Sequence, residues 1–210
     1  MDFNLSSVLG KQLSEPSGFF GRIIARFMHD SNAPMYESAL NSLKIKPGDR
    51  VLEIGFGNGT HFKNIIHELN PKTYSGIEIS DAMLKAARKK NKPLIEQGKI
   101  KLFKASIENL PFEAHSFDKV YTVNTIYFWR SPEKAVSEVF RTLSDNGLFT
   151  VSLNSKSLLE TKKFAANRFT LYSKEEVIHL LEFAGFTHIK ENYQQFKHQD
   201  CLTITGKKSI

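Results

Sequence analysis

Cysteine is almost absent from this chain of 210 residues, which contains only Cys201. A single cysteine cannot close a disulfide within the chain, so a disulfide-stapled fold is excluded and a reducing cytoplasm is the expected location. No histidine or cysteine cluster has the spacing of a metal site, so we expect no metal. No apolar run approaches the ~20 residues that a membrane-spanning helix needs, and residues 1–10 lack the regions of a signal peptide. We therefore expect no membrane partner.

Acidic residues are fewer than basic ones, 22 against 29, which gives a net charge of +7 at pH 7. Residues 85–104 contain eight basic residues and one acidic residue, an excess equal to that of the whole chain. Two interpretations of this basic segment stay open. It is either a solvated face with a lysine-protected edge strand, or a patch that binds a polyanion such as RNA.

The most informative stretch begins with the apolar run Val51–Ile54, which predicts a buried strand. Glycine follows at every second position, Gly55, Gly57 and Gly59, and then apolar residues recur on one helical face from His61 to Leu69. Glycine permits positive φ and removes the Cβ that would block a ligand. The N-terminus of the next helix adds unpaired N–H groups and partial positive charge. This strand, glycine turn and helix start predict a site for a nucleotide-like cofactor.

Strand and helix signals alternate along the rest of the chain, which predicts the α/β class. Residues 1–44 are predicted to form a separate helical segment before a domain at 45–210. A turn at Ser144–Gly147 is expected to lead into a strand at Leu148–Leu153, and a capping box at Ser173 to open a late helix. Further strands are predicted at Tyr74–Ile79, Lys99–Lys104, Phe117–Asn124, Thr187–Gln194 and Cys201–Gly206.

Three segments resemble one enzyme family. Glu53 precedes the first glycine by two residues, and Glu78 follows the last by 19. This pattern, E-I-G-x-G-x-G and then I-E, resembles motif one and the next acidic position of class I S-adenosylmethionine (SAM) dependent methyltransferases. Ala105–Phe112 resembles that family's G-D-A-E-N-L-P-F segment. The resemblance, to a small-molecule methyltransferase of the type 11 kind, runs from about Lys46 to the C-terminus. It implies a Rossmann-like, doubly wound, seven-stranded, mostly parallel sheet with an antiparallel last strand and an N-terminal helical lid.

The resemblance also implies cofactor contacts. Gly55, Gly57 and Gly59 would approach the amino-acid part of SAM, and Glu53 would meet its ammonium group or orient the glycine turn. Glu78, with Ile79 beside it, would hold the ribose, since a carboxylate accepts from two hydroxyls. The alternative for Glu78 is a strand-end carboxylate beside a helix N-terminus. Ser106 and Ile107 would contact adenine, although Ser106 replaces the family's aspartate and is a weaker acceptor. Asn124 would border the transferred methyl group.

On the acceptor side, Met28, Asn32 and Tyr36 of the predicted lid can face the cofactor. Tyr127 and Trp129 follow Asn124 and form either an aromatic wall for an apolar or cationic acceptor or simple packing, which is also the alternative for Met28 and Tyr36. Asn124–Tyr127 lacks the two prolines of methyltransferases that act on adenine amines, which argues against nucleobase amines. Tyr36, Tyr127 and His61 are candidates for a general base, and the sequence favours none of them.

The predicted function is methyl transfer from SAM to a small-molecule acceptor. Such a reaction needs no catalytic triad or metal, because the protein only aligns donor and acceptor and excludes water. An NAD(P)-dependent oxidoreductase is the first alternative, and the G-x-G-x-G spacing argues against it. An RNA-acting methyltransferase, or a noncatalytic SAM-binding protein, is the second, based on the basic segment. The sequence leaves open the identity of the acceptor and its reacting atom, the oligomeric state, and whether residues 1–18 are ordered without ligand.

Overall fold

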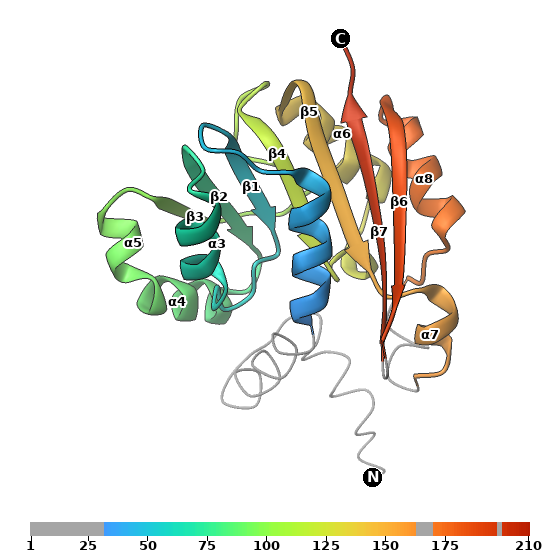
Figure 1. Cartoon of the computed structure of the whole chain (residues 1–210), viewed down its shortest axis with the longest axis horizontal. Coiled ribbons are helices and arrows are strands. Elements are labelled where there is room, and N and C mark those ends of the chain that lie inside the picture. The colour runs from blue at the N-terminus through green and yellow to red at the C-terminus, as the bar shows by residue number, and fades with distance from the viewer. Residues whose placement is uncertain (1–31, 163–169, 197–198) are drawn as a thin grey trace.

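The computed structural model describes residues 32–162, 170–196 and 199–210. Their strands form one seven-stranded sheet in the order β3-β2-β1-β4-β5-β7-β6 (Figure 1). The strands, in chain order from β1 to β7, are Arg50–Ile54, Thr73–Glu78, Ile100–Lys104, Phe117–Val123, Leu143–Leu153, Phe186–Gln195 and Asp200–Lys208.

The pairing of the strands confirms the predicted topology. β1 lies between β2 and β4 and is parallel to both, while β7 is antiparallel to its neighbours β5 and β6. Chain order runs from β1 outward to β3 and then returns to β4 on the other side of β1. The point where the strand order reverses therefore lies at the carboxyl ends of β1 and β4, which is where doubly wound sheets bind ligands.

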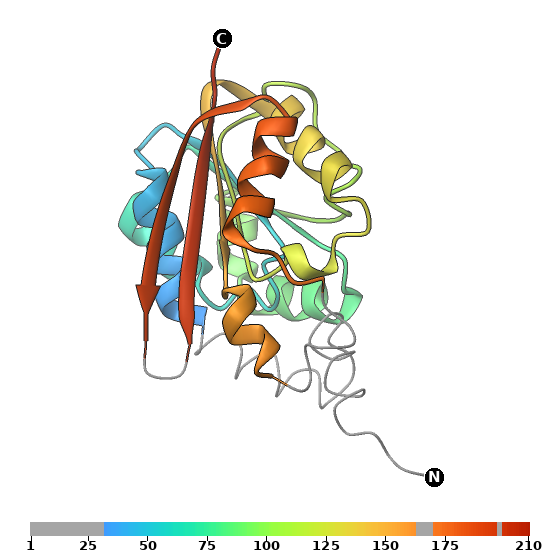
Figure 2. The ribbon, with the colours of Figure 1, turned by 90° about the vertical axis from the view of Figure 1, so that its right-hand side faces the viewer.

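Helices cover both faces of the sheet. Residues 32–43 are helical and lie with α3 (Phe62–Leu69) on one face, while α6 (Pro132–Thr142) and α8 (Lys174–Phe183) lie on the other, as the two views show (Figures 1 and 2). The other helices are α4 (Asp81–Lys90), α5 (Lys92–Glu96), the 3-10 helix η1 (Ile126–Phe128) and α7 (Lys156–Glu160). The core divides into two clusters accordingly, because alternate residues of β1 point to opposite faces: Val51 to the first and Leu52 to the second.

The described part of the predicted lid packs directly on the sheet. Met35, Ala39 and Leu43 are fully buried in the first cluster, and the Ser38 hydroxyl lies 2.8 Å from the Thr203 hydroxyl of β7. Residues 1–31 of the predicted helical segment, and Met28 with them, lie outside the described residues. The boundary near residue 44 stays a prediction. In the part of the chain that the structure describes, no helix has the length and apolarity to cross a bilayer.

Of two local sequence signals, the capping box at Ser173 and the turn at Ser144–Gly147, the structure bears out the first and not the second. The capping box is present, with Ser173 and Glu176 bonding each other's backbone N–H groups. The predicted start of the fifth strand at Leu148 was wrong, because β5 already begins at Leu143, which pairs with Phe117. Asn146 takes a φ of 64°, and the register shifts between Phe117 and Lys119. The residues expected to form a turn therefore form an irregularity inside a continuous strand.

Candidate active site

The glycine bend after β1 exposes bare backbone. Gly55, Gly57 and Gly59 all have positive φ, at 72°, 59° and 60°. A Cβ on Gly55 would lie 2.4 Å from Cγ2 of Thr125, whereas a Cβ on Gly57 would meet no heavy atom within 4 Å. Gly55 thus lets β1 and the β4 loop approach each other, and Gly57 borders open space. The space over Gly57 is available to a ligand.

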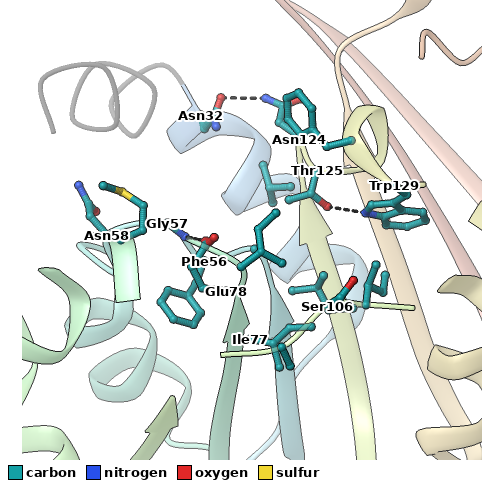
Figure 3. A pocket seen from close by; sticks show the side chains of 18 of the residues that line it. Asn32, Phe56, Gly57, Asn58, Ile77, Glu78, Ser106, Asn124, Thr125 and Trp129 are labelled. Carbon is teal, nitrogen blue, oxygen red and sulfur yellow. Dashed lines mark hydrogen bonds between the residues drawn. The ribbon is translucent and has the colours of Figure 1, made fainter. Parts of the chain in front are cut away.

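A cavity with an empty volume of ≈ 1000 Å³, counted out to solvent, lies above this bend. Its walls come from the carboxyl ends of β1, β2, β3 and β4 and from the helix at 32–43 (Figure 3). Nine predicted site residues line it: Tyr36, Gly55, Gly57, Glu78, Ile79, Ser106, Ile107, Asn124 and Trp129. Three do not: Glu53, Gly59 and Tyr127. Asn32, which is expected to face the cofactor, also lines it, as do Thr125 and Phe128, which lie between Asn124 and Trp129 in the sequence. Sequence reasoning missed three further lining residues: Asn58, Met83 and Glu108.

Glu78 ends β2 at the cavity wall and is only 7% exposed. Its Oε2 accepts from the N–H of Gly57 and its Oε1 from the N–H of Ser80, both at 2.9 Å (Figure 3). Burial raises the pKa of this carboxyl, and the backbone N–H groups oppose that rise. The carboxylate therefore closes the glycine bend onto β2, and its remaining lone pairs are available to ligand hydroxyls. Both roles that the sequence suggested, ribose acceptor and strand-end partner of backbone groups, are compatible with this position.

The loop after β3 forms the opposite wall. Ile107 is buried and lines the cavity beside Ser106 and Glu108. The Ser106 hydroxyl donates to Oε2 of Glu108, whose Oε1 accepts from the N–H of Arg130 at 2.9 Å. Glu108 belongs to the segment that resembles the family, but its spacing alone did not reveal that it turns back toward Ser106.

Asn124, at the end of β4, connects four parts of the fold. Its Nδ2 donates to Oδ1 of Asn32 at 2.9 Å (Figure 3). Its Oδ1 accepts from the hydroxyl of Tyr127 at 3.0 Å and from Nδ2 of Asn154 at 3.1 Å. Its φ of 56° is left-handed, a conformation that asparagine tolerates better than most residues. Asn124 thus joins β4, η1, the residue after β5 and the helix at 32–43 beside the cavity.

The two aromatic candidates, Tyr127 within η1 and Trp129 just after it, lie in different surroundings. Trp129 lines the cavity, and its Nε1 donates to Oγ1 of Thr125 at 3.2 Å. Tyr127 is 4% exposed and uses its hydroxyl inside the fold, where it contacts Asn124 and Asn154. This placement of Tyr127 agrees with the packing alternative rather than the aromatic wall.

Glu53 lies behind the bend and not in the cavity wall. It is 1% exposed, and the hydroxyls of Tyr74 and Tyr121 donate to its Oε2 while Nε2 of His61 lies 2.8 Å away. Tyr36 also bonds to Glu53, and its ring packs against His61 with centroids 4.2 Å apart. Burial, and then the charge of Glu53, raises the pKa of Tyr36, Tyr74 and Tyr121, so the phenols stay protonated and donate. Of the three general-base candidates, Tyr36 alone lines the cavity.

Comparison with known proteins decides the family. Residues 52–151 match the model of a methyltransferase domain family. The chain is 28% identical over 190 residues to the uncharacterized methyltransferase YdaC of Bacillus subtilis, across 89% of this chain and 98% of that protein. The chain belongs to the class I SAM-dependent methyltransferases. Its methyl donor is therefore SAM, which rules out the oxidoreductase alternative.

A further relative and a solved structure are also similar to this methyltransferase. It is 26% identical over 142 residues to 2-methyl-6-phytyl-1,4-hydroquinone methyltransferase 2 of Oryza sativa, across 67% of this chain and 40% of that protein. A chain in the complex of the Haloferax volcanii Trm112 methyltransferase activator with a methyltransferase shares its fold, with a TM-score of 0.77 at 17% identity over 89% of this chain and 93% of that one.

The cavity of the methyltransferase fits SAM. The open space over Gly57 would receive a ligand close to backbone, and the buried carboxylate of Glu78 has lone pairs that could accept from a vicinal diol. Ile79 and Ile107 supply apolar surface for a flat ring. Among the described residues no group of histidine, cysteine, aspartate and glutamate side chains could hold a metal ion.

Proposed function

We propose that this methyltransferase transfers the methyl group of SAM to a small molecule held in the same cavity. The observation that carries the proposal is the wall formed by the helix at 32–43. Asn32 and Tyr36 of this helix face the cavity, and Asn32 is bonded to Asn124 beside it. A site enclosed in this way on several sides is typical of small-molecule pockets.

The chemistry needed from the protein is modest. SAM supplies an activated methyl group, so the chain has to align an acceptor with it and exclude water. Thr125 fixes the ring of Trp129, and Phe128 adds a second aromatic surface next to it. Tyr36 adds a third aromatic side chain at this wall, while its hydroxyl bonds to Glu53 behind the bend. These residues favour an acceptor with an apolar or aromatic body, and the rice relative is named for such a substrate, a phytyl hydroquinone.

The basic segment gives little support to RNA as the acceptor. It forms α4, α5 and β3, and β3 is an edge strand, as predicted. Four of its eight cations contact groups of the same chain: Arg88 bonds the Leu102 carbonyl, Lys90 the Thr60 hydroxyl, Lys92 Glu96 and Lys104 Asp81. This segment therefore fits a solvated face with a protected edge.

The test is transfer of label from SAM carrying a labelled methyl group. The protein would be incubated separately with the small-molecule ultrafiltrate, the RNA and the protein fraction of a cell extract. We expect label in the ultrafiltrate, at the same level when Lys89, Lys90 and Lys92 are replaced by alanine. Label that enters RNA, and is lost in the triple variant, would overturn the proposal in favour of an RNA-acting methyltransferase.

A further inference from the structure

Ser106 and Glu108 form a hydrogen-bonded pair in the wall of the cavity. Both side chains line the cavity, and the Ser106 hydroxyl donates its proton to Oε2 of Glu108. The other oxygen of Glu108 accepts from the N–H of Arg130 at 2.9 Å. Glu108 is thereby fixed from the side of η1 and α6 and directed at Ser106.

Glu108 stays ionised in this arrangement. Burial raises the pKa of its carboxyl, but hydrogen bonds, those from Ser106 and Arg130 among them, outweigh burial and leave the pKa below its usual value. An ionised carboxylate only accepts hydrogen bonds. The single hydroxyl proton of Ser106 is therefore committed to Glu108 and is not available to a ligand.

A free serine hydroxyl can act as donor or acceptor, because it carries one proton and two lone pairs. In this chain the N–H of Glu108 occupies one lone pair of Ser106 weakly, at 3.4 Å. One lone pair remains for the cavity. Ser106 consequently presents an acceptor, and a hydroxyl that donates to a carboxylate is a stronger acceptor than an isolated one.

The position of this pair relative to the rest of the site indicates which part of SAM it meets. The glycine bend follows β1, Glu78 ends β2, and Ser106 follows β3, on three strands that are adjacent in the sheet. A ligand whose diol reaches Glu78 and whose charged chain lies over Gly57 extends its third part, the purine, toward Ser106. Ile107, which is buried beside Ser106, offers the apolar contact that a purine face needs.

We propose that Glu108 is a specificity-determining positioning residue, which holds Ser106 as a hydrogen-bond acceptor so that the cavity selects a purine with an amino group at C6 over one with a carbonyl. The amino group donates to Ser106, whereas a carbonyl would place two lone pairs against each other. The pair would thus do with a neutral hydroxyl what a carboxylate at position 106 would do directly. The inference rests on SAM as cofactor and not on the identity of the acceptor.

The test compares dissociation constants, measured by calorimetry, for S-adenosylhomocysteine and S-inosylhomocysteine, which carries a carbonyl at C6. Since the carbonyl form also changes ring N1 from acceptor to donor, a third ligand with hydrogen at C6 isolates the C6 contact. We expect the wild type to prefer the amino ligand over both others by at least about tenfold, as sites that bond a polar substituent reject analogues lacking it. Glu108→Gln should reduce the preference over the carbonyl ligand to within about threefold, because an amide can donate to Ser106 and release its hydroxyl proton.

Two further variants make the test decisive. Ser106→Ala removes the hydroxyl itself and leaves the Glu108 side chain in place. It should lose the same preferences. Glu138→Gln is the matched control, because Glu138 anchors the same loop through the Leu110 N–H at 2.9 Å and does not line the cavity. It should keep the wild-type preference. Equal weakening of all three ligands in Glu108→Gln, or a wild type without preference at C6, would overturn the proposal. Loss of every ligand from the wild type would instead contradict the cofactor site itself.

Discussion

Replacing Gly57 by alanine should weaken cofactor binding at least tenfold at a small cost to the fold. The new Cβ would have no protein atom within 4 Å, so it causes no clash in the free protein. The cost to the fold is the left-handed φ of 59°, about 1 kcal/mol for a residue with a Cβ. For a chain of this length, that corresponds to a fall in Tm of about 2–4 °C. The same Cβ occupies the open space over the bend, and we expect at least a tenfold loss of SAM affinity, about 1.4 kcal/mol.

Gly98→Ala is the matched control for this prediction. Gly98 lies between α5 and β3, has a φ of 69°, and likewise has no atom within 4 Å of a built Cβ, but it does not line the cavity. It should show the same small fall in Tm and unchanged affinity. Calorimetric titration with SAM and thermal unfolding of both variants would check this. If Gly57→Ala bound SAM as tightly as Gly98→Ala, the glycine bend would not be the cofactor's resting surface.

Three further predictions test the site and its frame. Glu78→Ala should weaken SAM more than tenfold and lower the free energy of unfolding by about 2–3 kcal/mol, since two backbone N–H groups lose their acceptor; unchanged affinity in titration would contradict the ribose assignment. Gly55→Ala places a Cβ 2.4 Å from Thr125 Cγ2 and should cost about 3 kcal/mol in urea unfolding. Thr125→Ser, which removes that methyl group, should recover part of the loss, and no recovery would show that the contact is not the cause. Hydrogen bonds from Arg50 lower the pKa of Asp118 below its usual 3.8, so its stabilisation is complete above pH 3.8 and is lost as pH falls through the lowered value. Wild type and Asp118→Asn should therefore differ in stability near neutral pH and converge in acid, and a constant difference would refute this account.

Much of the cofactor side could be predicted from the sequence because its signals are local. The apolar run and the glycine spacing after Val51 identify the central strand and the bend, and the distance along the chain to Glu78 places a carboxylate at the end of the neighbouring strand. Parallel strands end at one edge of a sheet, so these features meet without further information. The contacts of Ser106 and Ile107 with adenine remain predictions, although the structure places both residues in the cavity wall.

The surroundings of Glu53 could not be predicted, because its partners come from three different elements. Tyr74 and Tyr121 stand within apolar strands and are indistinguishable in sequence from packing aromatics, yet their hydroxyls meet the same carboxylate from β2 and β4. Only the register of those strands beside β1 makes the three side chains neighbours. Tyr127 shows the same limitation, since a rotation of one short 3-10 helix decides between cavity and interior.

The shared amide of Asn124 has a practical consequence. The helix at 32–43 cannot separate from the sheet near Asn32 without breaking a bond to that one side chain. The Nδ2 protons of Asn124 would therefore shift in an amide NMR spectrum whenever this helix moves. A single assigned resonance pair would then report whether the bond between this helix and the sheet is intact before and after SAM is added.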